Sequence, residues 1–564
     1  MLDNYEIYKE KALDSCEQVF LIEYNRSIGI PLPIVTVDNY LPGDPNYFSG
    51  QYYISIGNTW QIHLDFGKLP TSYKEFQEEV RVLTRHEVEH YMCCPFDVLT
   101  HFRMLKAIID TYHQQYSHHL IDIVSLSGSL ANQAADIIID TKNFYRHKSE
   151  TLKSEIAWIK KGGNESFKDL KRHSKLMSLT KEAIWKESLE LYEDDNELKA
   201  EVESLAIKFV NGEIDNRGLF ISKTIDYTHS FFKLFEQDKQ DEKQQNNSET
   251  GSGQSNSQQS GQPQIAPSKD SQENGSQFNF QSTDKIKEAL IQLAQEASLG
   301  QFSQILAAAG LSSLTEKEKQ KIWFDAQNAD IIPIIEKSPE GSNDNYSYPT
   351  TWKLGDPLEE MDMMLSFSTS PVIIPGVTTK KWIQNHVFSA GSEKKDIDLL
   401  LIIDTSGSMG AVIDAKTNLH QAVLAAYGII KYFESKKNQI ALIGFSDRIT
   451  VNVDWTKDYD HIREQLLLNG SGGTNFPINR IQSIIDSSKN PLVTVIITDG
   501  EIQNISQTIA YFKEYLTDGN KLFIFLQDRK STIEHYKTLT NYGAKVSKTL
   551  TANEMRDSVL NEVI

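Results

Sequence analysis

The stretch DIDLLLIIDTSGSMG, residues 396–410, decides the fold of the C-terminal part of the chain. Its first half is a nearly continuous apolar run, which is typical of a strand buried on both faces of a parallel sheet. The run ends at Asp404, and Ser406 and Ser408 follow in a D-x-S-x-S pattern. The sequence therefore predicts a buried strand with polar side chains at its carboxyl end.

Strands and helices alternate from this stretch to the end of the chain. Such alternation predicts an α/β fold with a doubly wound, mostly parallel sheet, which is a Rossmann-like arrangement. The clearest further segments are a helix-like NLHQAVLAAYGIIKYFES at 418–435, a strand QIALIGFSD at 439–447, an edge hairpin RITVNVDW at 448–455, and strands PLVTVIITDG at 491–500 and KLFIFLQ at 521–527.

Polar residues gather where these strands end, and ligand sites of doubly wound sheets lie there. Hydroxyl and carboxylate oxygens without histidine or cysteine are hard ligands that suit magnesium. We therefore predict a magnesium site with one position open for a carboxylate from a protein partner. The alternative is that the neighbouring glycines mark ordinary turns and the hydroxyls cap helices. The predicted ligands are Asp404, Ser406, Ser408, Thr474 and Asp499.

A second candidate site lies in RHEVEHYMCCP, Arg85 to Pro95. Two short strands, YYISIG and TWQIHLDFG, precede it, and Ser72 with Glu75 has the form of a capping box. A helix is expected from Tyr73 to about Cys94, because Phe76, Val80 and Leu83 form an apolar stripe and Pro95 ends it.

On such a helix His86 and His90 stand one turn apart on one face and can share a zinc ion. Glu87 beside them can act as the general base that takes a proton from water at the metal. The alternative is a surface helix with a polar face, since Arg85 and Glu89 also surround the motif.

A catalytic zinc needs a third protein ligand. The segment SLANQAADIIIDTKNFYR, residues 129–146, reads as a helix with Asp136 and Asp140 on one face in an apolar context. Asp136 is the first choice as third ligand, and Asp140 is expected to orient a zinc-bound histidine. The alternative for this pair is helix capping or an ion pair with Lys142 or Arg146. His118 and His119 are weaker candidates, in what reads as a solvated turn.

The combination of HEVEH, a helix of the form A-A-D-x-x-I-D and a C-terminal DTSGS resembles one group of bacterial proteins. These join a zincin-like metallopeptidase domain to a von Willebrand factor A (VWA)-like domain. The resemblance covers both ends of the chain and implies that Asp136 is a metal-binding acid. It also implies that Ser406, Ser408 and Thr474 touch the ion of a metal-ion-dependent adhesion site directly, with Asp404 and Asp499 acting partly through water. Asp140 stands where members of the group often carry asparagine.

Composition bounds the remaining possibilities. A chain of 564 residues, 39% hydrophobic and 24% charged, is expected to form about two or three globular domains. A net charge of −20 argues against broad nucleic-acid binding. The three cysteines cannot make a disulfide framework, and neither a signal peptide nor a membrane span is visible. We therefore expect a cytoplasmic protein.

Four regions follow from these patterns and from the resemblance. We expect a zincin-like α+β metallopeptidase domain at 1–236 and a disordered Gln/Ser/Asn-rich linker at 237–282 that tethers the domains. A helical segment and connector at 283–395 precede a VWA-like domain at 396–564.

Two functional hypotheses compete. In one, the chain is a zinc-dependent metallopeptidase whose VWA domain binds a protein through magnesium. In the other, it is a non-catalytic adaptor or co-chaperone for a MoxR-type AAA+ ATPase, as the resemblance implies, in remodelling or in phage defence.

Overall fold

The structure is a computed structural model. It describes residues 2–24, 34–38, 52–55, 61–65, 72–119, 121–161, 167, 170–191, 193–246, 284–311, 314–328, 346–353, 356, 361–363, 366, 378–384, 397–527, 533–549 and 551–563. The chain divides into two compact units, Met1–Trp323 and Phe324–Ile564.

A six-stranded sheet forms the centre of the unit Phe324–Ile564, in the order β11-β10-β9-β6-β7-β8. All neighbouring strands are parallel except β7 and β8, which pair antiparallel. This confirms the predicted parallel sheet and its antiparallel edge hairpin. The strands are β6 (Asp398–Asp404), β7 (Ile440–Phe445), β8 (Ile449–Thr456), β9 (Leu492–Thr498), β10 (Lys521–Leu526) and β11 (Lys545–Lys548).

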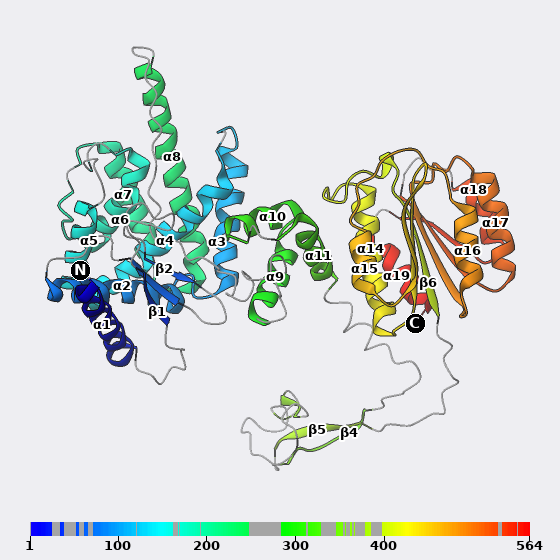
Figure 1. The fold of residues 1–564 in the computed structure, drawn as a ribbon, viewed down its shortest axis with the longest axis horizontal. Helices are drawn as coiled ribbons and strands as arrows, with labels where there is room; N and C mark the ends of the chain where they lie inside the picture. Colours follow the sequence, from blue (N-terminus) through cyan, green and yellow to red (C-terminus); the bar gives the residue numbers. More distant parts are fainter. Residues whose placement is uncertain are drawn as a thin grey trace. The chain divides into compact units, whose positions relative to one another are not determined.

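Helices cover both faces of this sheet, with α14 and α19 on one side and α16 and α17 on the other (Figure 1). Every residue of β6 is buried. Leu400 and Ile402 pack in one cluster with Phe512 of α17, so the alternate residues of β6 turn to the opposite face. Because β6 is buried on both faces of the sheet, its sequence is a nearly continuous apolar run, as predicted. The helical elements are η9 (Gly407–Met409), α14 (Asn418–Ser435), α15 (Tyr459–Gln465), α16 (Ile478–Ser487), α17 (Ile505–Thr517), α18 (Glu534–Thr540) and α19 (Ala552–Val563).

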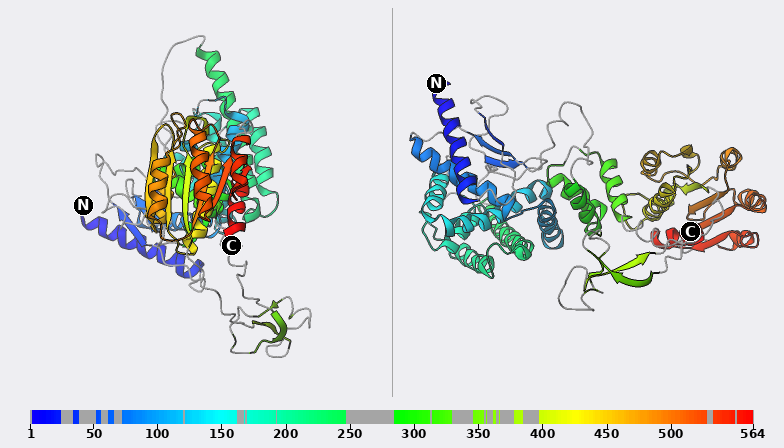
Figure 2. Two further views of the ribbon diagram at one scale, coloured as in Figure 1. Left: turned by 90° about the vertical axis from the view of Figure 1, so that its right-hand side faces the viewer. Right: turned by 90° about the horizontal axis from the view of Figure 1, so that it is seen from below.

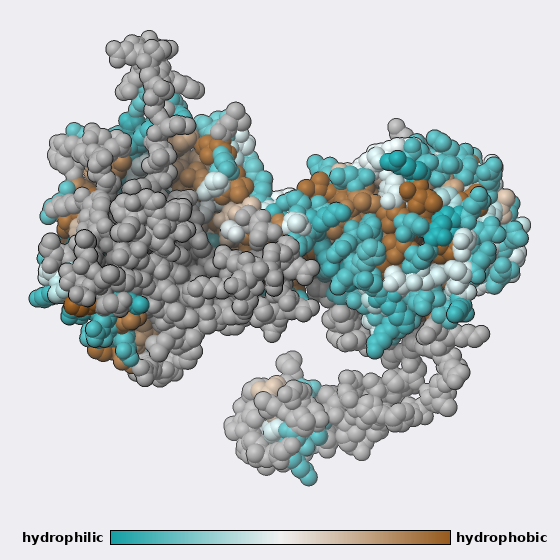
Figure 3. Space-filling model, in the orientation of Figure 1, coloured by the Kyte–Doolittle hydropathy of each residue, from teal (hydrophilic) through white to brown (hydrophobic). Residues whose placement is uncertain are grey.

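The same unit also contains a two-stranded antiparallel sheet of β4 (Tyr346–Thr351) and β5 (Lys380–Gln384). The sequence of this connector offered no motif, and the pairing was not predicted. Figure 3 shows hydrophilic residues over much of the described surface of the C-terminal unit, with hydrophobic residues gathered over its middle.

The unit Met1–Trp323 contains a small mixed sheet in the order β1-β3-β2. The two predicted strands are β2 (Tyr52–Ser55) and β3 (Gln61–Asp65), which pair antiparallel. The third strand, β1 (Ile34–Asp38), runs parallel to β3 and was not predicted.

Helices make up the larger part of this unit, and α4 packs against α2, α3, α6 and α8. Residues on more than one side of α4 are buried, from Leu130 to Phe144. The helical elements are α1 (Leu2–Gln18), η1 (Val19–Glu23), α2 (Tyr73–Met92), α3 (Val98–Thr111), η3 (Tyr112–Tyr116), α4 (Ile123–Arg146), α5 (Lys148–Lys161), α6 (Arg172–Trp185), α7 (Asn196–Val210), η5 (Arg217–Leu219), α8 (Phe220–Asn246), α9 (Asp284–Glu296), α10 (Leu299–Ala308) and α11 (Glu316–Gln327), the last of which continues into the second unit.

The predicted capping box at the start of α2 is wrong, although the helix begins where expected. Among the described contacts, the Ser72 side chain makes no capping hydrogen bond. The first turn is held instead by the backbone bond from Phe76 N to Ser72 O, 3.0 Å, and by edge-to-face packing of Phe76 on Tyr8. Tertiary packing has replaced the local cap.

The predicted linker overlaps an ordered helix at its beginning. Helix α8 continues to Asn246, so residues 237–246 are helical, and its end projects beyond the neighbouring helices (Figures 1 and 2). Arg172 pairs with Asp238 and Asp241, and the Nδ1 atom of His173 lies 2.7 Å from Asp238 Oδ2. These contacts supply charge partners for a segment that is polar in sequence. The remainder of the predicted linker, 247–282, lies outside the described residues.

The helices that follow 247–283 pack back on the same unit. Helix α9 lies against α3, and α10 lies against α3 and α4. Arg103 pairs with Glu296, and Gln301 Nε2 donates to Asp110 Oδ1 at 2.7 Å. We had expected residues 283–395 to form a separate connecting region, but the structure places its helices up to Trp323 with the N-terminal helices.

No helix in the described part of the chain is long and apolar enough to cross a membrane. Cys16, Cys93 and Cys94 are buried free thiols.

Candidate metal centres

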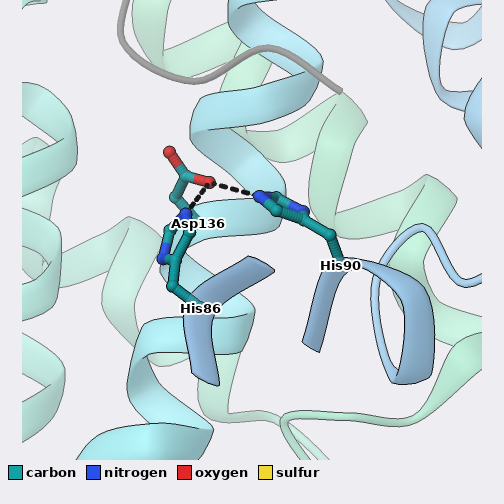
Figure 4. A group of neighbouring side chains, drawn as sticks. All are labelled: His86, His90 and Asp136. Atoms are coloured by element: carbon teal, nitrogen blue, oxygen red, sulfur yellow. Dashed lines mark ion pairs between the residues drawn. The ribbon is translucent and has the colours of Figure 1, made fainter. Parts of the chain in front are cut away.

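Three side chains from two helices converge in the N-terminal unit (Figure 4). His86 and His90 come from α2 and Asp136 comes from α4. The Asp136 Oδ1 atom lies 3.5 Å from His86 Nε2 and 3.4 Å from His90 Nε2. The structure thus brings together the three residues that the sequence suggested as zinc ligands.

The spacing of these atoms fits a zinc ion. Zinc bonds of about 2.0–2.1 Å in tetrahedral geometry set neighbouring ligand atoms about 3.3 Å apart. Within the described residues, His90 Nε2 and Asp136 Oδ1 are buried and make no hydrogen bond. Buried polar atoms without partners are rare and costly, so a cation between them would satisfy both. Two imidazole nitrogens and a carboxylate oxygen are also the donors that zinc prefers.

The far side of each ligand is held by a second contact. His86 Nδ1 lies 2.7 Å from Asp140 Oδ1, and His90 Nδ1 lies 3.0 Å from the Cys94 carbonyl oxygen. Asn132 Nδ2 donates to Asp136 Oδ2 at 2.9 Å. Because the Nδ1 atoms face acceptors, each ring can keep a proton at Nδ1 and offer Nε2 to a metal.

Asp140 is itself held by a buried lysine. Lys181 Nζ, from α6, lies 2.5 Å from Asp140 Oδ2 and 3.0 Å from Glu155 Oε1. Burial alone would raise the pKa of Asp140, but Lys181 and His86 hold that pKa well below its usual range. Asp140 therefore stays ionised as a partner for His86.

Glu87 lies on α2 between His86 and His90, and its exposed fraction is only 2%. Among the contacts of the described residues, its carboxyl makes no hydrogen bond or ion pair. Burial raises the pKa of Glu87, and the neighbouring His86 and His90 act in the opposite direction. A carboxyl group in this setting is free to exchange a proton.

The polar face of α2 is not a solvated surface, which was the alternative interpretation of the motif. Arg85, Glu87, Glu89 and His90 are all buried. Lys142 and Arg146, the alternative partners considered for the two aspartates, pair instead with Glu89 at 2.8 and 3.2 Å. The two aspartates therefore contact the histidines and Lys181 instead.

A second centre lies at the carboxyl ends of β6 and β9. Asp404 Oδ1 accepts from Ser406 N at 2.9 Å, and Asp404 Oδ2 accepts from Thr498 Oγ1 at 2.7 Å. Ser408 Oγ lies 3.1 Å from Ser406 Oγ and donates to Asp499 Oδ2. Burial raises the pKa of Asp404 to about 6, with Asp499 acting in the same direction. Four of the five predicted ligands are therefore joined in one network of oxygens, which suits a hard divalent cation.

Thr474, the fifth predicted ligand, is buried and is brought to this edge by its loop. Gly407 N donates to Gly472 O at 3.1 Å, and Ser471 N donates to Thr405 O at 2.9 Å. Gly472 has a φ of +81°, and a Cβ there would lie 2.5 Å from Asp447 Oδ1. The close approach to the D-x-S-x-S turn itself requires glycine at 470, where a Cβ would lie 2.5 Å from Ser406 O and 2.7 Å from Gly410 O.

Sequence reasoning missed several of the supporting residues. Asn132 precedes Asp136 by one helical turn, so the spacing alone could have indicated it. Lys181 and Glu155 come from two later helices and carry no local signal. Thr498, directly before Asp499, could have been suspected as a hydroxyl at a strand end.

Comparison with known proteins identifies the segment that contains the second group of predicted ligands. The family described as the von Willebrand factor type A domain matches residues 399–501. No curated protein matches the chain.

Similar solved structures include three bacterial proteins. One, the three N-terminal domains of the type V pili tip protein Mfa5 from Porphyromonas gingivalis, is 23% identical with a TM-score of 0.18; the match covers 19% of this chain and only 20% of that one. An aerotolerance-related membrane protein from Bacteroides fragilis is 16% identical over 30% of this chain and 98% of its own, with a TM-score of 0.25. The conserved hypothetical protein BatB from Bacteroides thetaiotaomicron is 15% identical over 30% and 97%, also with a TM-score of 0.25.

The family match spans β6, the D-x-S-x-S turn, the Thr474 loop and Asp499. Residues 399–501 therefore form a von Willebrand factor type A domain.

Proposed function

We propose that the protein is a zinc-dependent metallopeptidase, with a zincin-like N-terminal part and a VWA domain that binds a protein partner through magnesium. The observation that carries the enzymatic part is the convergence of His86, His90 and Asp136 beside the buried Glu87. The VWA family match supports a role in protein interaction.

In the zinc centre, His86, His90 and Asp136 would hold the ion, and Asp140 would orient the His86 ring. When bound there, zinc supplies Lewis acidity: it polarises a carbonyl and lowers the pKa of water. The Glu87 carboxylate would accept a proton from the attacking water and then pass it to the leaving amine of a peptide bond. The buried surroundings of Glu87 exclude competing solvent and strengthen its interactions with charge.

In the VWA domain, Asp404, Ser406, Ser408, Thr474 and Asp499 would hold magnesium at a metal-ion-dependent adhesion site. A carboxylate from the partner would complete the coordination, because the set leaves a position open. The resemblance in the sequence points to a MoxR-type AAA+ ATPase as one candidate partner.

Zinc content tests the first centre. The purified protein, without an affinity tag, is expected to lose one zinc ion per chain on His86→Ala. The variant His113→Ala removes an exposed histidine of η3 and is expected to keep the full zinc content. Equal zinc in wild type and His86→Ala would overturn the site.

Glu87→Gln tests catalysis separately from metal binding. It is expected to retain zinc but to lower the rate of peptide hydrolysis by at least about 100-fold, the usual contribution of a general base. Glu78→Gln, on the exposed face of the same helix, is the control. Undiminished hydrolysis in Glu87→Gln would remove Glu87 from the mechanism. A protein that binds zinc and partner but hydrolyses no peptide would favour the adaptor hypothesis instead.

Asp404→Ala tests the VWA domain. Partner capture from a lysate of the source cells is expected to require magnesium and to fail in this variant. Asp518→Ala, which removes an exposed aspartate at the end of α17, should behave as wild type. Capture that survives both chelation and Asp404→Ala would contradict a metal-dependent mode.

A further inference from the structure

A second group of metal-binding side chains lies in the N-terminal unit, apart from the three converging residues of α2 and α4. It consists of His118, His119 and Glu236. Both His118 Nε2 and His119 Nε2 point at the same oxygen, Glu236 Oε1, at 3.1 and 2.8 Å. Two imidazole nitrogens and one carboxylate oxygen are the same donor set as in the first centre.

The turn that carries the histidines is fixed by its own backbone contacts. His119 N donates to Tyr116 O at 3.0 Å, and Ile121 N donates to His119 O at 2.9 Å. The buried Tyr112 hydroxyl also donates to His119 O. The turn is therefore tied to η3 through Tyr112 and Tyr116.

The helix that carries Glu236 is fixed against the same element by aromatic packing. The Tyr116 and Phe232 rings stack at 4.9 Å with an interplanar angle of 21°. The His119 ring lies edge-on to Phe235, with centroids 5.9 Å apart. These contacts hold the two segments that carry the donors together before any ion arrives, which lowers the entropic cost of binding.

We propose that His118, His119 and Glu236 form a second zinc site, open to solvent. The side chains are 62%, 21% and 30% exposed, so water can fill the remaining position and the ion can exchange. The nitrogen–oxygen distances are slightly shorter than the roughly 3.3 Å between ligands of tetrahedral zinc. A small rotation of the exposed Glu236 side chain would admit the ion.

Zinc in this site would join the turn after η3 to α8. Binding to the folded state alone stabilises it in proportion to RT ln(1 + [Zn]/Kd). Zinc in excess is therefore expected to raise the thermal midpoint of the protein even when the first centre is removed. The two sites differ in burial, so the open site should release zinc faster to a chelator.

The test is a zinc titration of the full-length, untagged protein in competition with a chromophoric chelator. Wild type is expected to bind two zinc ions per chain, His86→Ala one, Glu236→Gln one, and the double variant none. His118→Ala should match Glu236→Gln, and His113→Ala, an exposed histidine that contacts Gln304, should bind two. Far-UV circular dichroism checks that each variant is folded.

If the three side chains simply hydrogen-bond to one another, Glu236→Gln and wild type will bind equal numbers of zinc ions, and the proposal is overturned. A His86→Ala variant that binds no zinc would overturn it as well. The outcome is separate from that of the proposed peptidase, since His86→Ala leaves only the open site to be measured.

Discussion

Asp140 links the proposed zinc centre to the core, because its two carboxylate oxygens face different partners. One oxygen meets His86 Nδ1 and the other meets Lys181 Nζ. The histidine is thereby held in one tautomer by a group that is itself held by a buried cation. Such outer contacts tune metal affinity without touching the ion.

Asp140→Ala is expected to weaken zinc binding by about 10- to 100-fold, because the His86 ring loses its acceptor. Asp140→Asn should fall between the alanine variant and wild type, since an amide oxygen can still accept from Nδ1. Chelator competition measures both affinities, with Asp226→Ala, which breaks an exposed pair between Asp226 of α8 and Lys208 of α7, as the control. Unchanged affinity in Asp140→Ala would rule out this orienting role.

Lys181→Met is expected to lower the free energy of unfolding by about 3–5 kcal/mol, because two carboxylates are left buried without a cation. Urea denaturation in the presence of a chelator isolates this effect from zinc binding. Lys153→Met, which breaks an exposed pair with Glu78, should change stability little. A Lys181→Met protein as stable as this control would show that the buried network contributes nothing.

At the scale of residues, the sequence indicated those side chains of the candidate site that belong to a local sequence pattern. His86 and His90 were identifiable from helical spacing, and Asp136 and Asp140 from their position one turn apart in an apolar part of a second helix. Lys181 could not be predicted, because its role depends on how helices distant in sequence pack together. The Cys94 carbonyl lies only four residues after His90, but a backbone carbonyl leaves no mark in the sequence. The absence of a cap at Ser72 has the same origin: packing by Tyr8 replaced a local hydrogen bond.

At the scale of elements, the edge of the sheet that carries the proposed magnesium site depends on a close approach between two loops. The turn after β6 and the loop before α16 are joined by the bond from Gly407 N to Gly472 O. A side chain at position 472 would meet the Asp447 carboxylate at once. A Cβ at Gly470 would lie 2.5 Å from Ser406 O in the turn, so the loop needs glycine at 470 for its close approach and at 472 for its positive φ.

Gly472→Ala is therefore expected to destabilise the VWA domain and to weaken magnesium binding. Gly519→Ala provides a matched control, because Gly519 has the same φ of +81° but open space around its Cβ. The control should lose about 1–2 kcal/mol from backbone strain alone, and Gly472→Ala should lose more. Thermal denaturation with and without magnesium measures both, and equal losses would show that the contact with Asp447 is unimportant.

Elements with a strong periodic pattern were predictable. The helix expected at 418–435 is α14, residue for residue, and the apolar run became β6. Strand β1 was not found, since its parallel partner β3 lies more than twenty residues away and its pairing leaves no short-range mark. The length of α8 was underestimated because charge partners on α6 stabilise an end that looks unstructured by composition.

At the scale of the whole molecule, the two compact units meet the sequence expectation of more than one domain, but the helices after residue 283 belong with the N-terminal ones. Leu293 of α9 is fully buried. The Gln/Ser/Asn-rich stretch therefore does not mark the boundary between the two units, although its composition suggested that it would.

A protease that cuts between residues 247 and 282 is expected to leave both fragments associated, because α9 and α10 pack on α3 and α4. Gel filtration of the nicked protein should give a single peak, which separates into two in urea. Leu293→Glu places a charge in that packing and should let the nicked fragments part without denaturant. Spontaneous dissociation of nicked wild type would contradict the assignment of α9 and α10 to this unit.

The return of α9 and α10 to the N-terminal helices changes what the Gln/Ser/Asn-rich stretch can do. Both of its ends are anchored in one unit, so its length does not set the reach of the VWA domain. Doubling such an insertion costs only about 0.6 kcal/mol of closure entropy. A change in the length of this stretch therefore costs little folding free energy. A shortened version should leave the distance that the VWA domain can reach unchanged.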